Sequence, residues 1–293
     1  MLLIMTDLQN QIVLVTGATS GIGEATARTL AQRGAHVILL ARNAAKAEAT
    51  RAAIQQAAGH DRVDVLLADL ADLDQVRRVA AEFNARYPRL DILVNNAGLL
   101  PGKERKTTPQ GYEAGLATNY LGPFLLTALV FDKLQQSPAA RIINVSSEGY
   151  RLAKPNFADL QQERGYGPMR VYSNTKLYNI LFTQELARRL RAHGIQNVTT
   201  NALHPGVVAS SFASDSNGWM AAAMLLARPF MISAEQGAAT SLFLAADPSV
   251  AQISGGYYVK KKPEAVKHPF STLANARQLW QHTEELTGAQ FLD

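Results

Sequence analysis

The chain has 293 residues, of which 47% are hydrophobic and 18% charged, and it contains no cysteine. This composition excludes an intrinsically disordered chain, and the lack of cysteine excludes disulfides, thiolate nucleophiles and cysteine-ligated metal sites. The net charge of +5 mildly favours anionic ligands. The basic residues are scattered, so we expect no nucleic-acid partner. We find no membrane-spanning run, signal peptide or histidine pattern typical of a metal site, and we expect a cytoplasmic protein without a metal.

Short apolar runs alternate with longer segments of helical pattern along the chain. The runs predict strands at Ile12–Thr16, His36–Ala41, Val63–Ala68, Asp91–Asn95, Arg141–Ser146, Val198–Leu203 and Tyr257–Val259. The longer segments predict helices at Gly21–Arg33, Ala44–Ala58, Leu73–Tyr87, Gly111–Gln136, Val171–His193 and Ala234–Ala246. This order predicts one doubly wound, Rossmann-type α/β domain over residues 1–293, with a mainly parallel sheet and helices on both faces. Ligands of such sheets bind outside the carboxyl ends of the strands.

A glycine-rich loop, Thr16–Gly23, joins the first strand to the first helix. Gly17 permits a tight turn, while Gly21 and Gly23 carry no side chain to keep a phosphate from the amides of the helix N-terminus. Thr19 and Ser20 add hydroxyl donors. The spacing departs from G-x-G-x-x-G, and no Lys-Ser/Thr pair of a P-loop follows. Alone, the loop could be an ordinary strand-to-helix turn; its place in an α/β chain favours a dinucleotide site.

The loop resembles the cofactor loop of the short-chain dehydrogenase/reductase family. Further motifs of that family follow in order over nearly the whole chain: Asp69-Leu70, Asn95–Gly98, Asn119, Ser146-Ser147, Tyr172-x-x-x-Lys176 and Pro205-Gly206. Three segments are similar to the retinol-dehydrogenase-like branch, namely Tyr172–Leu177, Ser254–Tyr258 and Leu279-Trp280. Retinol-active members usually carry a membrane anchor, and none is visible here. We therefore do not assume retinoid activity.

The resemblance implies a nicotinamide cofactor. The residues expected to hold it are Gly17, Thr19, Ser20, Gly21, Ile22, Gly23, Arg42, Asp69, Leu70, Asn96, Ala97, Gly98, Tyr172, Lys176, Pro205, Gly206 and Val208. Asp69 would flank the adenine or instead cap the following helix, and Asn95 would stabilise the sheet. At the end of the second strand, Ala41 stands where NAD-preferring relatives carry aspartate. Arg42 can pair with a 2′-phosphate, although it could also be a plain surface arginine. We predict NADP(H).

Tyr172 and Lys176 lie four residues apart on a predicted helix and so share one face. An isolated pair of this kind is usually a surface pair. Here the ammonium should lower the phenol pKa from ~10 and prepare Tyr172 for general acid or base catalysis, and Lys176 should also hold the nicotinamide ribose. The resemblance assigns Ser147 to the substrate oxygen and Asn119 to a proton relay through water to Lys176. We interpret His204 as structural.

These features predict an NADP(H)-dependent oxidoreductase that interconverts a carbonyl and an alcohol, with a small hydrophobic substrate. The segments expected at the substrate site are 99–108, 149–169 and 211–231. The last could be an apolar lid or a packed core helix. The alternatives are a catalytically idle NADP(H)-binding regulator and a scaffold that binds no nucleotide. A homo-oligomer is possible, and assembly stays open.

Overall fold

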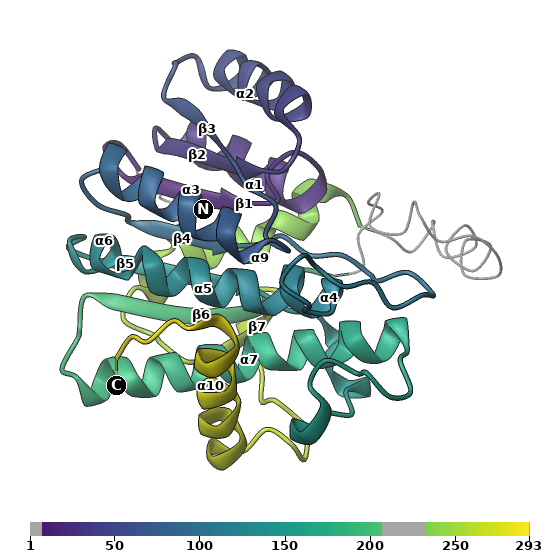
Figure 1. The fold of residues 1–293 in the computed structure, drawn as a ribbon. Helices are drawn as coiled ribbons and strands as arrows, with labels where there is room; N and C mark the ends of the chain where they lie inside the picture. Colours follow the sequence, from purple (N-terminus) through teal and green to yellow (C-terminus); the bar gives the residue numbers. More distant parts are fainter. Residues whose placement is uncertain (1–7, 207–231, 293) are drawn as a thin grey trace.

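The computed structural model describes residues 8–206 and 232–292. Within these ranges, eight strands form one sheet in the order β3-β2-β1-β4-β5-β6-β7-β8 (Figure 1). The first seven strands run parallel, and β8 pairs antiparallel with β7. Their bounds are β1 (Ile12–Thr16), β2 (His36–Ala41), β3 (Val63–Leu67), β4 (Ile92–Asn95), β5 (Ala140–Val145), β6 (Val198–His204), β7 (Tyr257–Val259) and β8 (Lys262–Pro263). The predicted fold class is confirmed.

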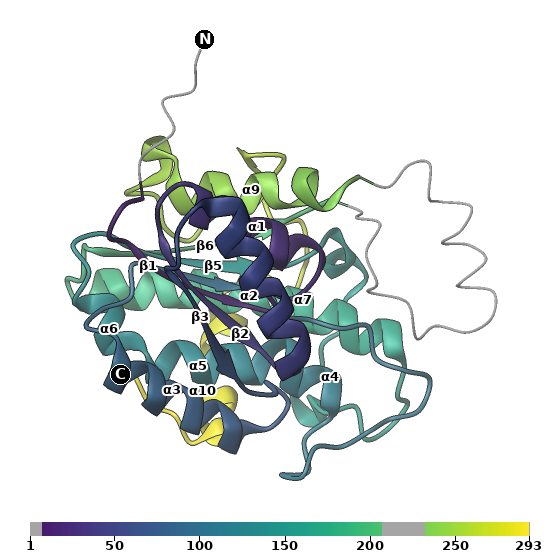
Figure 2. The ribbon, with the colours of Figure 1, turned by 90° about the horizontal axis from the view of Figure 1, so that it is seen from above.

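Helices cover both faces of the sheet (Figure 2). One face carries α1 (Gly21–Gln32), α2 (Ala44–Ala58) and α9 (Ala234–Ala246); the other carries α3 (Leu73–Arg86), α5 (Gly122–Leu129) and α7 (Pro168–Ala192). Successive side chains of a strand point to opposite faces. Val13 and Val15 therefore pack in the core on the α1, α2 and α9 side, and Leu14 packs in the core on the α3, α5 and α7 side. Because both faces are covered, every residue of β1 is buried, and the strand is mostly apolar rather than alternating. No helix in the described ranges is long and apolar enough to cross a membrane.

The predicted single helix over 111–136 is wrong in form. The structure has α4 (Ala114–Leu116), a π-helical turn (Ala117–Leu121), α5 and then α6 (Phe131–Gln135). Gly122 donates its N–H to the carbonyl of Ala117, five residues back. Proline lacks an N–H, so Pro123 cannot make the α-helical bond to the carbonyl of Asn119. The local chemistry therefore favours a widened turn around Asn119, a predicted catalytic residue.

A helix absent from the sequence prediction, α10 (Leu273–Thr287), packs outside α5 and α7. Figure 1 shows it in yellow beside them. The ring centroid of Trp280 lies 5.1 Å from that of Phe124, 5.7 Å from Phe182 and 4.9 Å from Phe291. The guanidinium of Arg189 lies 4.5 Å from the Trp280 centroid. This aromatic cluster fixes α10 on the face that α5 and α7 share.

Candidate active site

The carboxyl ends of β4 and β5 gather the predicted catalytic residues. Ser147 follows β5, and the Tyr172 hydroxyl makes a hydrogen bond with its side chain. The Nζ of Lys176 lies 5.6 Å from the centroid of the Tyr172 ring. Gly98 follows β4, and a Cβ added there would lie 3.3 Å from that Nζ and 3.4 Å from Oδ1 of Asn119. The structure thus brings all four residues of the predicted constellation to one place.

Lys176 is a buried ammonium, and no carboxylate of residues 8–206 or 232–292 pairs with it. The residue is only 3% exposed, and its Nζ donates a hydrogen bond to the carbonyl oxygen of Val145 at 3.0 Å. Among the residues that the structure describes, this is the one hydrogen-bond partner of Nζ. Burial lowers the pKa of Lys176 to about 8. An ammonium has three donors, so two remain for a ligand.

The phenol of Tyr172 departs from the sequence prediction. Burial raises its pKa above the ordinary value, while the hydrogen bond with Ser147 acts in the opposite direction. We predicted a lowered pKa for this phenol; in this structure the pKa is raised instead, because desolvation of the phenolate outweighs the hydrogen bond with Ser147. Tyr172 is therefore a neutral phenol at neutral pH.

The side chain of Asn119 clamps the loop after β4. Its Oδ1 accepts the N–H of Leu99 at 2.8 Å, and its Nδ2 donates to the Leu99 carbonyl at 2.9 Å and to Oγ1 of Thr175 at 3.2 Å. These contacts fix Gly98 and Leu99 against α7. The proton relay predicted for Asn119 stays a prediction, and the clamp is a role that the sequence did not reveal.

The glycine-rich loop is closed by contacts that leave no room for side chains. Gly17 has φ +64°, and a Cβ on Gly23 would lie 2.3 Å from the Gly17 carbonyl oxygen and 2.4 Å from Nδ2 of Asn96. That Nδ2 donates to the carbonyl of Thr16 at 2.9 Å. Ser20 is the N-cap of α1 and makes no capping bond with its side chain. The first amides of α1 therefore stay available to an anion, beside Thr19, Gly21 and Ile22.

Two buried polar residues, Thr16 and Asn95, make hydrogen bonds that stabilise the glycine-rich loop and the sheet, respectively. Oγ1 of Thr16 accepts the N–H groups of Asn96 at 3.0 Å and Ala97 at 2.9 Å. We did not predict this role for Thr16, although a polar residue at the end of a buried strand is a usable signal. Asn95 donates to Oδ1 of Asn144 at 2.9 Å, across the β4–β5 pair. As predicted, Asn95 stabilises the central sheet.

Comparison with known proteins identifies the family. The family model for short chain dehydrogenases matches residues 11–221. The chain belongs to the short chain dehydrogenase family. It is 39% identical to retinol dehydrogenase 12 from Homo sapiens over 97% of this chain and 89% of that protein, in keeping with the predicted branch. Its oxidoreductase class follows from the family.

Two solved structures resemble this dehydrogenase. A protein from Mycobacterium paratuberculosis superposes with a TM-score of 0.80 at 31% identity, covering 98% of this chain and 97% of that one. A protein from Escherichia coli CFT073, solved in complex with NADPH, superposes with a TM-score of 0.69 at 25% identity and covers 87% of this chain and 99% of that one. A chain of this fold thus binds NADPH in at least one relative.

At the end of β2, the dehydrogenase presents Arg42 on its surface, directly after the buried Ala41. Asp69 accepts the N–H of Ala71 at 2.9 Å. It does not cap α3, because the N-cap of that helix is Asp72. The capping alternative for Asp69 is therefore wrong. Leu70 is buried, at 4% exposure.

After β6, the dehydrogenase turns at Pro205 and Gly206, whose φ is +98°. Two predictions lie outside the described residues: the cofactor contact of Val208 and the substrate segment 211–231. The other two substrate segments meet each other. Nε of Arg105 donates to the carbonyl of Gln161 at 3.1 Å, and the Tyr166 hydroxyl donates to the carbonyl of Gly102 at 2.9 Å.

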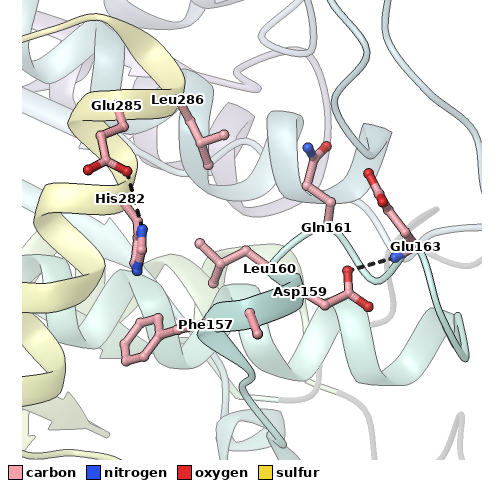
Figure 3. A pocket seen from close by; sticks show the side chains of 9 residues that line it. Phe157, Asp159, Leu160, Gln161, Glu163, His282, Glu285 and Leu286 are labelled. Atoms are coloured by element: carbon pink, nitrogen blue, oxygen red, sulfur yellow. Dashed lines mark hydrogen bonds and ion pairs between the residues drawn. The ribbon is translucent and has the colours of Figure 1, made fainter.

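A shallow hollow of about 220 Å³ lies between the 157–163 segment and α10 of the dehydrogenase (Figure 3). Its apolar lining includes Phe157, Leu160 and Leu286, and His282 lies 5.4 Å from the Phe157 ring, centroid to centroid. None of the lining residues is a predicted catalytic or cofactor-binding residue. Its lining residues between 157 and 163 belong to the predicted substrate segment 149–169.

Proposed function

We propose that this chain is an NADP(H)-dependent oxidoreductase that interconverts a carbonyl and an alcohol, with Tyr172 as general acid and base. One observation supports this most strongly: a half-buried phenol shares a hydrogen bond with Ser147 beside a buried ammonium that has no carboxylate partner in the described ranges. A purely structural lysine would not be expected to stay buried with two donors unused. A site that polarises an oxygen and exchanges its proton uses such groups.

The pKa directions suit carbonyl reduction. Since burial raises the pKa of Tyr172, the phenol carries its proton at neutral pH and can donate it to an oxygen that gains negative charge. Ser147 lies beside it and can donate a second hydrogen bond to the same oxygen. In the oxidative direction the same phenol must first lose its proton, which the positive charge of Lys176 favours.

The residues present fit a dinucleotide. The glycine-rich loop and the open amides of α1 suit a diphosphate, and the two spare donors of Lys176 suit ribose hydroxyls. When bound, the nicotinamide supplies or accepts the hydride. The exposed Arg42, with Ala41 in place of an acid, favours the 2′-phosphate of NADP, and the NADPH complex of the Escherichia coli relative supports the same choice.

The substrate proposed is a small hydrophobic alcohol or carbonyl compound. Two large apolar side chains of the 149–169 segment are exposed, Leu152 at 65% and Met169 at 44%. Because this segment joins Ser147 to Tyr172 along the chain, exposed apolar groups on it favour a lipophilic ligand. The similarity to retinol dehydrogenase 12 supports a substrate of this class.

We further propose a single domain over 1–293 and a cytoplasmic location.

Tyr172→Phe tests the proposed role of the phenol. The variant should lose turnover of a carbonyl panel while NADPH binding, followed by its fluorescence, stays near wild type. Tyr178→Phe is the matched control, because Tyr178 lies on the same helix and its buried hydroxyl has no hydrogen-bond partner in the described structure. Turnover in Tyr172→Phe close to that of the control contradicts the proposal and favours an idle NADP(H)-binding protein.

The cofactor choice has its own test. Ala41→Asp combined with Arg42→Ala should weaken NADPH binding and strengthen NADH binding, because an acid binds the free ribose hydroxyls and repels the 2′-phosphate. The ratio of kcat/KM for the two cofactors is the measurement. An unchanged ratio would show that the end of β2 does not select the cofactor.

A further inference from the structure

A single histidine links the two loops at the edge of the proposed active site. His204 is the last residue of β6 and directly precedes Pro205 and Gly206. Its Nδ1 lies 3.2 Å from the backbone nitrogen of Glu148, the residue after Ser147. A backbone N–H can only donate, so Nδ1 must be the acceptor. The ring in this contact is therefore neutral, with its proton on Nε2.

We propose that His204 is a positioning residue of the reaction: while neutral it holds the Ser147–Glu148 backbone in register with the Pro205-Gly206 turn, and on protonation it releases that backbone. The inference rests on the proposed function, because it concerns the placement of Ser147 and Tyr172 during catalysis. It assigns no proton transfer to His204 itself.

The Ser147 side chain depends on the backbone that His204 holds. Oγ of Ser147 accepts the N–H of Gly149 at 3.1 Å, so it caps the short 3₁₀ turn Glu148–Leu152. A Cβ added to Gly149 would lie 3.1 Å from Cε1 of Tyr172 and 3.4 Å from Oγ of Ser147. The turn therefore packs directly against both catalytic side chains, and a shift at Glu148 moves Ser147 relative to Tyr172.

The charged groups that act on His204 come from two other elements. The carboxylates of Glu148, in the 3₁₀ turn, and Glu264, after β8, both favour the protonated ring. Glu148 accepts a hydrogen bond from the Tyr257 hydroxyl at 2.9 Å and pairs with Arg151, which also reaches Glu264 at 2.8 Å. Arg151 thus shares the charge of both carboxylates.

Burial determines the direction of the pKa shift of His204. Desolvation lowers the pKa of His204 below its ordinary value and outweighs the two carboxylates. The ring is therefore neutral at neutral pH, and its acceptor bond to Glu148 is present. As the pH falls through this lowered pKa, Nδ1 gains a proton and faces the Glu148 N–H as a second donor. The bond is lost, and turnover should decline on the acidic side.

Two substitutions distinguish the role of His204 as a hydrogen-bond acceptor from the effect of its protonation. His204→Asn places an amide oxygen near the position of Nδ1 and cannot titrate, whereas His204→Leu removes the acceptor. We expect His204→Leu to lower kcat by about tenfold or more at neutral pH, since small misplacements of catalytic groups have effects of this order, with NADPH binding nearly unchanged. At acidic pH the wild type has lost the same bond, so the two kcat values should converge. His204→Asn should keep most of the neutral-pH kcat and lose the acidic decline that the wild-type enzyme shows.

A nitrogen-edited NMR spectrum of the histidine rings gives a readout that needs no turnover. We expect the Nε2–H tautomer of His204 near neutral pH, and a Glu148 amide signal that shifts with pH in the wild type but not in His204→Asn. A protonated Nδ1 under these conditions, or an acidic decline that persists in His204→Asn, would overturn the inference. Absence of any carbonyl reduction by the wild-type chain instead defeats the proposed function, so the two failures are distinguishable.

Discussion

Replacing Lys176 by methionine should make the protein more stable while it removes activity. The residue is 3% exposed, and burial lowers its pKa from 10.5 to about 8. At ~1.4 kcal/mol per pKa unit, the folded state loses about 3 kcal/mol by keeping this ammonium charged at neutral pH. Methionine also gives up the hydrogen bond to Val145, at about 1 kcal/mol. The variant should therefore gain about 2 kcal/mol of unfolding free energy at pH 7.

The pH dependence distinguishes this mechanism from better packing. Below pH about 8, Lys176 is charged in both the folded and the unfolded chain, and the full destabilisation is present. Between about 8 and 10.5 the folded chain releases the proton first. The unfolded chain then binds more protons, so wild-type stability rises with pH relative to the variant. The advantage of Lys176→Met should shrink through that window.

Urea unfolding of both proteins at several pH values measures the difference directly. Lys46→Met serves as the control, because Lys46 lies on the exposed face of α2. It should change stability by no more than about 0.5 kcal/mol. A Lys176→Met variant less stable than the wild type at neutral pH, or an advantage that does not vary with pH, would refute the reasoning.

Two further substitutions test the glycine-rich loop and the buried support of β1. Gly23→Ala puts a Cβ 2.3 Å from the Gly17 carbonyl oxygen, where real contacts stay above 3.0 Å. The Kd for NADPH should therefore rise about tenfold or more, and the melting temperature should fall. The control Gly102→Ala has open space around the added Cβ and should change neither quantity. Asp91→Ala removes a carboxylate, 3% exposed, that accepts the N–H of Ile12 at 2.7 Å and the Ser137 hydroxyl at 2.6 Å. It should destabilise the fold by about 3 kcal/mol in urea unfolding, and a loss below about 1 kcal/mol would contradict this support.

The sequence predicts β1, β2 and β4 well because each is a short, mostly apolar run that is almost wholly buried. β1 and β2 end at the predicted residues, Thr16 and Ala41. The four-residue spacing predicts that Tyr172 and Lys176 share one helix face, and the family resemblance predicts that Ser147 joins them. The prediction of one helix over 111–136 is wrong because the apolar pattern of the sequence continues through the π-helical turn. Only the missing N–H of Pro123 indicates the departure from α-helical hydrogen bonding.

Long-range contacts and burial set what the sequence could not show. The sign of the Tyr172 pKa shift depends on how completely the ring is buried, and residue spacing carries no such information. The bond between His204 and Glu148 joins residues 56 positions apart. From the sequence we interpret His204 as structural, and no pattern in the sequence points to Glu148 as its partner.

The aromatic cluster around Trp280 determines which surfaces another molecule can use. Since α10 already lies on the shared face of α5 and α7, those two helices have no free apolar side there to offer a second copy. A homo-oligomer would have to form through other parts of the surface, or displace Trp280 first. Removing this side chain alone would uncover Phe124 and Phe182 to solvent, and the protein would then become prone to self-association.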